Sequence, residues 1–234
     1  MNLKVYLGKD INNIDVVLDF STLELNLTLR LGATGTGKRV FHNQFYKELI
    51  KQNSPESLGF YFIDNTRVDL GSIPKPYLIK GSIDSKEAIK DFDEILEEVK
   101  GRNSGTRNKD KILFVHIEEC DQFAIDPIAT ANFYKEFIKY EQGSNIFLGY
   151  STSRIGADTL PEWLVKGANL KVVFELASAD NCQWVLGSGS YALLPLEFKQ
   201  AGQRLLIMKN RALFCQPFSD KELKEIRTFE QGKL

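Results

Sequence analysis

The sequence predicts an α/β fold, a mostly parallel β-sheet flanked by helices, because short apolar runs alternate with longer segments of helical periodicity. One of these runs, 112–117, is almost entirely apolar, which is typical of a strand covered on both faces. With 234 residues, 43% of them hydrophobic and 26% charged, the chain is long enough to bury one large core. We therefore expect a single domain over residues 1–234.

Periodicity places the elements in order along the chain. Leucines at every second position predict a strand that leads directly into Gly32, and apolar residues at helical spacing predict a long helix before the run 112–117. A polar segment rich in glycine and asparagine follows that helix. The predicted strands are 23–31, 58–63, 112–117, 145–151, 172–176, 204–208 and 212–215, and the predicted helices are 38–50, 85–99, 127–140 and one that begins after Ser219.

Turn and cap residues support three of these elements. The last two apolar runs flank Lys209 and Asn210, which predicts a carboxyl-terminal β-hairpin. Ser219 and Glu222 have the spacing of a capping box, which predicts the start of a final helix. Pro127, preceded by an aspartate, has the pattern of a helix start.

Composition and charge exclude several classes of protein. The three cysteines, Cys120, Cys182 and Cys215, are far apart and odd in number, so neither a disulfide framework nor a zinc site is indicated. The amino terminus lacks a signal-peptide pattern, and no run of about 18 apolar residues occurs, so we expect a cytoplasmic protein with no membrane segment of its own. The net charge of −1 gives no global attraction to nucleic acid, so any DNA contact would need a local basic patch.

The most informative motif is Gly32-Ala33-Thr34-Gly35-Thr36-Gly37-Lys38-Arg39, which matches the pattern G-x-x-x-x-G-K and departs from it only at the final Ser/Thr. A strand before it and a helix after it would point backbone N–H groups at phosphate oxygens, with Lys38 reaching the β- and γ-phosphates. A glycine-rich turn that binds nothing is the alternative. The three glycines, the lysine and the flanking elements together favour a P-loop that binds ATP through these eight residues.

The strand 112–117 is followed by two acids, Glu118 and Glu119. In P-loop ATPases of the ASCE class, named for an additional strand and a catalytic glutamate, the first acid holds Mg²⁺ and the second polarises the attacking water. We therefore predict Glu118 as the metal residue, one methylene longer than the usual aspartate, and Glu119 as the general base. Without the P-loop, two glutamates that merely cap a strand would be the preferred interpretation. We interpret His116 as a core residue.

Hydroxyl side chains and an arginine end the strand 145–151, where Thr152 and Arg154 lie between serines and the following loop. Such groups can place a donor near the γ-phosphate or the attacking water. An ordinary transition from strand to loop would explain the same residues equally well.

These pieces, in this order and spacing, resemble the motor domain of the FtsK/SpoIIIE family within the FtsK–HerA group. By this resemblance Lys38 binds phosphate, Glu119 is the general base and Thr152 is the sensor. Family members form hexameric rings that pump double-stranded DNA with ATP, which implies double-stranded DNA and further copies of the chain as partners. The matching segments are Leu7-Gly-Lys-Asp-Ile11, the P-loop, Ile63-Asp64 with Arg67-Val-Asp-Leu70, Glu118-Glu119, Ser-Thr-Ser-Arg154 and Phe174-Glu-Leu-Ala-Ser-Ala-Asp180.

The departures from the family pattern are concentrated where Mg²⁺ would sit. Arg39 replaces the hydroxyl that ligates the metal, and a guanidinium has no lone pair to offer a cation. Glu118 replaces an aspartate, and Gln183 stands where the family often has an arginine. Asn65-Thr66 replace Pro-Lys. We therefore predict that nucleotide binding persists while hydrolysis is slow. We expect neither the family's membrane-spanning region nor its winged helix here.

The sequence leaves three functions open. A ring-shaped DNA motor would need an arginine supplied across the subunit interface, for which Arg154 and Arg204 are the candidates. A non-hydrolysing subunit of a secretion or assembly complex, with membrane-anchored or secretion proteins as partners, is the second. A small-molecule kinase is the weakest, because no lid or substrate motif appears. The segment 100–111 carries five basic residues and is predicted to be a solvated loop, with DNA contact as the alternative.

Overall fold

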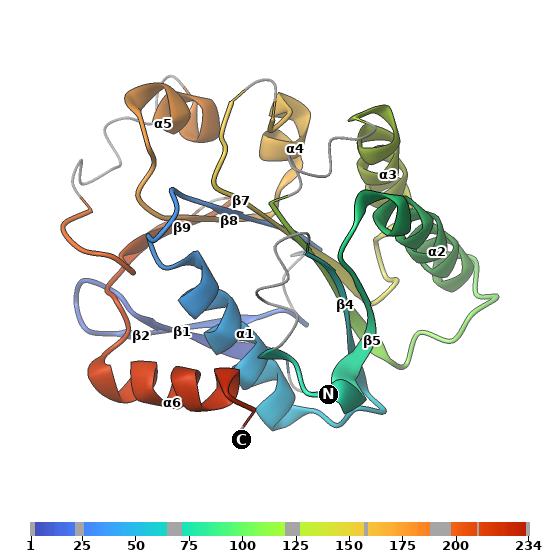
Figure 1. Ribbon diagram of the computed structural model, residues 1–234, viewed down its shortest axis with the longest axis horizontal. Helices are drawn as coiled ribbons and strands as arrows, with labels where there is room; N and C mark the ends of the chain where they lie inside the picture. The colour runs from blue at the N-terminus through green and yellow to red at the C-terminus, as the bar shows by residue number, and fades with distance from the viewer. Residues whose placement is uncertain are drawn as a thin grey trace.

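The computed structural model describes residues 3–21, 26–64, 72–119, 127–156, 159–187, 198–209 and 211–232. Within them, strands and helices alternate as the sequence predicts (Figure 1). The strands are β1 (Lys4–Lys9), β2 (Asp15–Asp19), β3 (Leu27–Leu31), β4 (Leu58–Asp64), β5 (Leu78–Ser82), β6 (Ile112–Glu118), β7 (Ile146–Thr152), β8 (Leu170–Val173), β9 (Arg204–Met208) and β10 (Arg211–Cys215). The helices are α1 (Lys38–Gln52), the short 3₁₀ helix η2 (Lys75–Tyr77), α2 (Ser85–Asn103), α3 (Pro127–Tyr140), α4 (Glu162–Gly167), α5 (Ala179–Leu186) and α6 (Asp220–Glu230).

Eight strands form one sheet in the order β10-β9-β8-β3-β7-β6-β4-β5, and β1 pairs with β2 in a separate hairpin. The six strands from β8 to β5 run parallel, β9 is antiparallel to β8, and β10 is antiparallel to β9. β7 lies between β3 and β6, which is the additional strand of the ASCE class. The predicted α/β fold of a P-loop ATPase, including its carboxyl-terminal β-hairpin, is confirmed.

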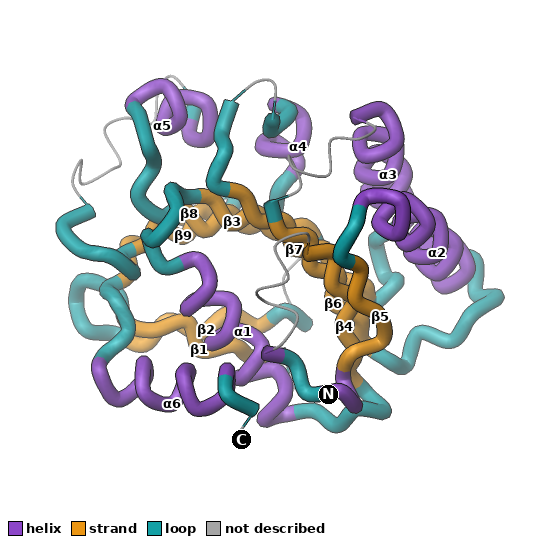
Figure 2. The backbone as a smooth tube through the Cα atoms, viewed as in Figure 1, coloured by secondary structure: helices purple, strands orange, loops and turns teal. Residues whose placement is uncertain are grey.

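The sheet separates two hydrophobic cores. Figure 2 shows it as a curved layer, with α1, α6 and the β1–β2 hairpin on the concave side and α2 to α5 on the other. Successive side chains of a strand point to opposite faces, so Phe114 packs in the first core and Val115 in the second. Every residue of β6 is buried, as expected for a parallel strand covered on both faces.

The strand that leads into the P-loop carries polar side chains in its interior. Thr28 and Arg30 alternate with the leucines of β3, yet both are buried, because helices or the hairpin cover each face of the sheet. The alternation in this part of the sequence therefore does not mark an exposed face. The predicted strand 23–31 is described from Leu27 onward, and its first residues lie outside the described part of the chain.

Parallel pairing aligns the ends of the strands that carry the predicted site. Leu31 pairs with Thr152, and Glu118 pairs with both Ser151 and Asp64. The carboxyl ends of β3, β4, β6 and β7 therefore meet at one edge of the sheet, which is where ligands bind in parallel α/β folds. Among the described residues, no helix combines the length and apolar composition needed to cross a membrane.

The structure also corrects some predicted boundaries. The helix predicted over 85–99 extends to Asn103, and the strand predicted over 172–176 is Leu170–Val173. The β1–β2 hairpin, β5, α4 and α5 were not predicted. The capping box is present: Ser219 accepts a hydrogen bond from the backbone N–H of Glu222, whose carboxylate accepts one from the backbone of Ser219.

The segment 100–111, predicted as a solvated loop, begins inside α2, which ends at Asn103, and residues 103–110 are exposed. Arg102 lies in the last turn of α2, is 4% exposed, and donates hydrogen bonds to Glu98 and to the carbonyls of Lys111 and Ser144. Arg107 pairs with Glu98 at 2.5 Å. The Arg102 guanidinium binds its own helix and neighbouring carbonyls because α2 continues past Lys100, where the loop was predicted to begin, and Arg107 reaches back to the same helix. The contacts favour a surface segment over a DNA contact.

Candidate nucleotide-binding site

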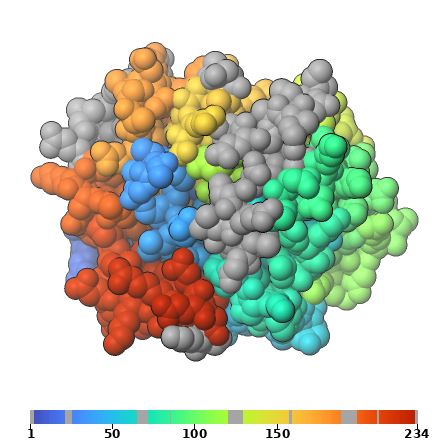
Figure 3. Space-filling view, viewed as in Figure 1, coloured from blue at the N-terminus to red at the C-terminus, as the bar shows by residue number. Residues whose placement is uncertain are grey.

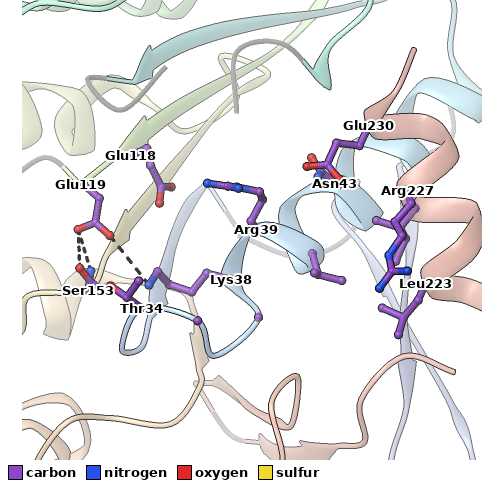
Figure 4. A pocket seen from close by; sticks show the side chains of 14 residues that line it. Thr34, Lys38, Arg39, Asn43, Glu118, Glu119, Ser153, Leu223, Arg227 and Glu230 are labelled. Atoms are coloured by element: carbon purple, nitrogen blue, oxygen red, sulfur yellow. Dashed lines mark hydrogen bonds and ion pairs between the residues drawn. The ribbon is translucent and has the colours of Figure 1, made fainter. Parts of the chain in front are cut away.

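A cavity of about 700 Å³ opens where the carboxyl ends of the strands meet the amino end of α1. In the space-filling view, α6 (red) adjoins the blue surface of the P-loop and α1 (Figure 3). Figure 4 shows two groups of side chains at opposite ends of the cavity, with Arg39 between them. The first group includes Lys38, Glu119 and Ser153, and the second includes Asn43, Leu223, Arg227 and Glu230.

The glycines of the P-loop are required by the backbone. Gly35 and Gly37 have φ angles of 85° and 110°, which side chains disfavour. A Cβ on Gly32 would lie 2.6 Å from Cβ of Phe174, the residue that follows β8, so only glycine fits at position 32. The N–H of Ala33 donates to the carbonyl of Glu175 at 2.8 Å, which anchors the loop to the sheet. The eight predicted residues thus form a tight turn that opens helix α1.

Lys38 lies buried beneath this turn. Its Nζ donates hydrogen bonds to the carbonyls of Gly32 at 2.7 Å and Ala33 at 3.3 Å. The same ammonium lies 4.0 Å from Oε1 of Glu119. The predicted phosphate-binding lysine and the predicted general base are therefore neighbours at one end of the cavity.

Glu119 is held by the end of β7. Its backbone adopts a positive φ of 44°, and its Oε2 accepts hydrogen bonds from the N–H and Oγ of Ser153 at 2.9 and 3.0 Å. The Oγ1 of Thr152 lies 3.4 Å from the same oxygen, but Thr152 is fully buried. Ser153, which the sequence did not single out, is the hydroxyl residue from the end of β7 that lines the cavity among the described residues. The exposed Arg154 is absent from the described residues that line it.

Glu118 faces two buried histidines. Its Oε2 lies 3.1 Å from Nε2 of His116 and 3.6 Å from Nδ1 of His42. Arg30 Nη1 lies 2.8 Å from Nδ1 of His116. A guanidinium only donates, so this Nδ1 accepts and the proton of the ring is on Nε2, from which it is donated to Glu118. Burial, and next the charge of Arg30, hold the pKa of His42 well below its ordinary value, so its ring is neutral.

The two histidines and Glu118 bring potential ligand atoms within 4.8 Å of one another, which raises the possibility of a transition-metal site. The hydrogen bond from Arg30 argues against it. A ring nitrogen that carries a proton has no lone pair for a metal, and Nε2 of His116 is in that state. We interpret the cluster as an arrangement that positions the Glu118 carboxylate.

The residues at this edge do not fit Mg²⁺ in the usual way. Arg39 stands where other P-loops offer a hydroxyl, and its side chain extends into the cavity toward Glu118 (Figure 4). A guanidinium offers the ion no lone pair and repels it. One oxygen of Glu118 already accepts a hydrogen bond from His116. At these two described positions, the customary metal ligands are replaced or engaged.

The FtsK/SpoIIIE family model matches residues 1–122. The chain belongs to the FtsK/SpoIIIE family. The DNA translocase FtsK of Chlorobaculum tepidum is 26% identical over an alignment that covers 83% of this chain and 28% of that protein. The chain therefore spans less than a third of the curated relative it matches. Membership implies the use of a nucleotide, typically with Mg²⁺.

Solved structures agree on the fold. The cytoplasmic domain of the type VII secretion ATPase EccC of Thermomonospora curvata has a TM-score of 0.69 and 17% identity, covering 97% of this chain and 31% of that chain. The conjugation coupling protein TcpA of pCW3 has a TM-score of 0.71 and 16% identity, covering 97% of this chain and 70% of that chain. At such identities the likeness establishes the architecture alone.

One residue considered for the ring of an FtsK/SpoIIIE motor is excluded by its position. Arg204 is fully buried and donates hydrogen bonds to the carbonyls of Leu7, Gly202 and Gln216. Its guanidinium carbon lies 4.3 Å from the centre of the Phe218 ring, and burial lowers its pKa to about 10. The prediction of Arg204 as an arginine supplied to a neighbouring subunit is wrong, because it joins the β1 hairpin to β9 within one chain.

Of the remaining positions compared with the family pattern, the structure describes Gln183 but not the second-strand motif. Gln183 lies exposed on α5, outside the lining of the cavity formed by the described residues. Arg67-Val-Asp-Leu70 and Asn65-Thr66, compared with the family's second-strand motif, lie outside the described residues.

Proposed function

We propose that residues 1–234 form the ATP-binding motor domain of an FtsK/SpoIIIE-type DNA translocase that works in the cytoplasm as a ring of identical subunits, with double-stranded DNA as its substrate. The observation that carries the proposal is the proximity of Lys38 and Glu119, whose Nζ and Oε1 lie 4.0 Å apart at one end of the cavity. A phosphate-binding group beside a carboxylate base is what nucleotide hydrolysis requires.

In this proposal the P-loop and Lys38 bind the phosphate chain. Glu119 polarises the attacking water, and the hydrogen bonds from Ser153 hold its carboxylate in a single orientation. Thr152, the predicted sensor, supports the same carboxylate from within the sheet. The exposed Arg154 is the remaining candidate for an arginine offered to a neighbouring subunit. When bound, Mg²⁺ would neutralise phosphate charge in the transition state.

The base of the nucleotide would lie toward α6. The cavity continues from the phosphate loop past Val40 to Leu223 and Ile226, which are apolar, and to Asn43 and Arg227, which are polar. A mostly apolar wall with a few polar groups suits a purine. α6 is fixed against α1 through Glu225, which pairs with Lys47 at 3.3 Å and lies 3.9 Å from Lys51.

A second function, a nucleotide-binding subunit that hydrolyses ATP slowly or not at all within a secretion or assembly complex, is favoured by a specific observation. Arg39 enters the cavity, and Glu118 is engaged by His116. Both positions normally serve the metal. The likeness to the secretion ATPase EccC is compatible with this role.

The test is ATP turnover with and without duplex DNA, with the oligomeric state measured in the same sample. Stimulation by DNA of a ring-sized particle supports the motor. Nucleotide binding with no turnover under either condition supports the second function. The Glu119→Gln variant is the control, because it keeps the hydrogen bonds of the site and removes the base. Turnover in that variant equal to the native chain would reject Glu119 as the base.

A further inference from the structure

We propose that the guanidinium of Arg39 takes over the charge-neutralising role of Mg²⁺, so that the preferred ligand of this cavity is a nucleotide without a bound metal. The inference rests on the proposed nucleotide site and deepens it, because it names the ionic form of the ligand. It follows from three features of the described residues: the place of Arg39, the engagement of Glu118 and the geometry of a guanidinium.

Arg39 is the first residue after the phosphate-binding lysine, in the first turn of α1. Its side chain lines the same cavity as Lys38 and Glu119, and Figure 4 shows it extending across that space toward Glu118. The side chain is exposed. It can therefore follow the phosphates of a ligand without first leaving a packed core.

The acid that would attract a dication is engaged. His116 donates a hydrogen bond to Oε2 of Glu118, and the orientation of that histidine is fixed by Arg30 from β3. Because Arg30 donates to Nδ1, Nε2 carries the ring proton and has no lone pair for a metal while this hydrogen bond lasts. A cation entering between Glu118 and Arg39 would meet a partly satisfied carboxylate and a positive charge.

A guanidinium is well suited to replace the ion. Its planar fork of N–H donors matches two phosphate oxygens at once, and it remains charged at every physiological pH. Together with the ammonium of Lys38, it places two positive charges at the phosphate end of the cavity. An ordinary P-loop site holds three positive charges, from lysine and Mg²⁺, so Arg39 supplies one of the two charges that the ion would bring. A magnesium-bound nucleotide would bring a further dication next to Arg39, and like charges at short range repel.

The test compares the affinity for ATP in excess EDTA with that in excess MgCl₂, measured by isothermal titration calorimetry. We expect the native chain to bind at least as tightly in EDTA as in MgCl₂. In Arg39→Ser, which restores the usual hydroxyl, we expect affinity in EDTA to fall about tenfold or more and Mg²⁺ to recover most of it. Arg211→Ser, at an exposed arginine of β10 that is not among the lining residues, should behave as the native chain.

The possible outcomes distinguish the role of Arg39 from the existence of the nucleotide site. Native affinity that rises tenfold or more with Mg²⁺ would overturn the role of Arg39 and leave the proposed nucleotide site intact. An Arg39→Ser variant whose affinity in EDTA equals that of the native chain would overturn it as well. Failure of the native chain to bind ATP or ADP in either buffer would overturn the proposed function itself. Thermal unfolding of each variant shows whether a lost affinity reflects a lost fold.

Discussion

Arg30 of β3 reaches across the intervening strand β7 to hydrogen-bond His116 of β6, with 2.8 Å between Nη1 and Nδ1. Gly149 of β7 makes this crossing possible, because a Cβ there would lie 3.0 Å from the guanidinium nitrogens. The phosphate-loop strand and the acidic strand are thus joined by side chains as well as by the sheet. The contact fixes the tautomer of His116 and with it the hydrogen bond to Glu118.

The His116→Ala variant tests this contact. It removes one acceptor of the buried Arg30 guanidinium and one donor to Glu118, so we expect the free energy of unfolding to fall by about 2–3 kcal/mol. His116→Gln, which retains an acceptor and a donor, should lose less. Urea denaturation of the three proteins measures the difference. A His116→Ala midpoint equal to the native one would show that the contact contributes nothing.

Arg102 and Lys109 belong to the same basic segment, but Arg102 has a structural role and Lys109 lies on the surface. Arg102→Ala removes the donor to two carbonyls and to Oε1 of Glu98, whose other oxygen keeps Arg107, so we expect a loss of about 2–3 kcal/mol of unfolding free energy. Lys109→Ala, at an exposed position, should change stability by less than about 0.5 kcal/mol. The measurement is urea denaturation of both variants. Equal stabilities would contradict the structural role of Arg102.

Glu141 gives the fold a predictable pH dependence. Burial raises the pKa of this carboxyl from 4.5 to about 7, and its Oε2 has no hydrogen-bond partner among the described residues. The folded state therefore binds the proton more tightly, and stability should fall as pH rises from 4.5 to about 7. Glu141→Gln should remove that decline and exceed the native stability at pH 8 by on the order of 1–2 kcal/mol. Denaturation curves at pH 4.5 and 8 measure it, and an unchanged native decline in the variant would contradict the assignment.

The fold and the position of the cavity could be predicted from the sequence because both depend on local patterns. The P-loop spacing predicts a strand, a tight turn and a helix, and Glu118 and Glu119 mark the end of a buried strand. These features come together at one edge because parallel strands place their carboxyl ends on the same side. Strand order was therefore enough to bring Lys38 and Glu119 into one space.

Other features of the site depend on contacts that no local pattern records. Successive side chains of a strand point to opposite faces, so the sequence alone does not say whether Thr152 or Ser153 faces the cavity at the end of β7. Arg30 and His116 are far apart in the chain and are joined only through the strand order and the space over Gly149. Arg204 was a candidate for contact with a neighbouring subunit because arginines are usually exposed, whereas its guanidinium packs on Phe218.

The most direct test of the account is the steady-state ATP turnover, in MgCl₂, of the native chain and the double variant Arg39→Ser with Glu118→Asp. The double variant restores a hydroxyl ligand and the shorter acid, so Mg²⁺ can stabilise the transition state. We predict slow native turnover and a gain of about tenfold or more in the double variant, since each ~1.4 kcal/mol of transition-state stabilisation is a factor of ten. Rapid hydrolysis by the native chain, or a double variant no faster than it, would contradict the claim that Arg39 and Glu118 separate binding from hydrolysis.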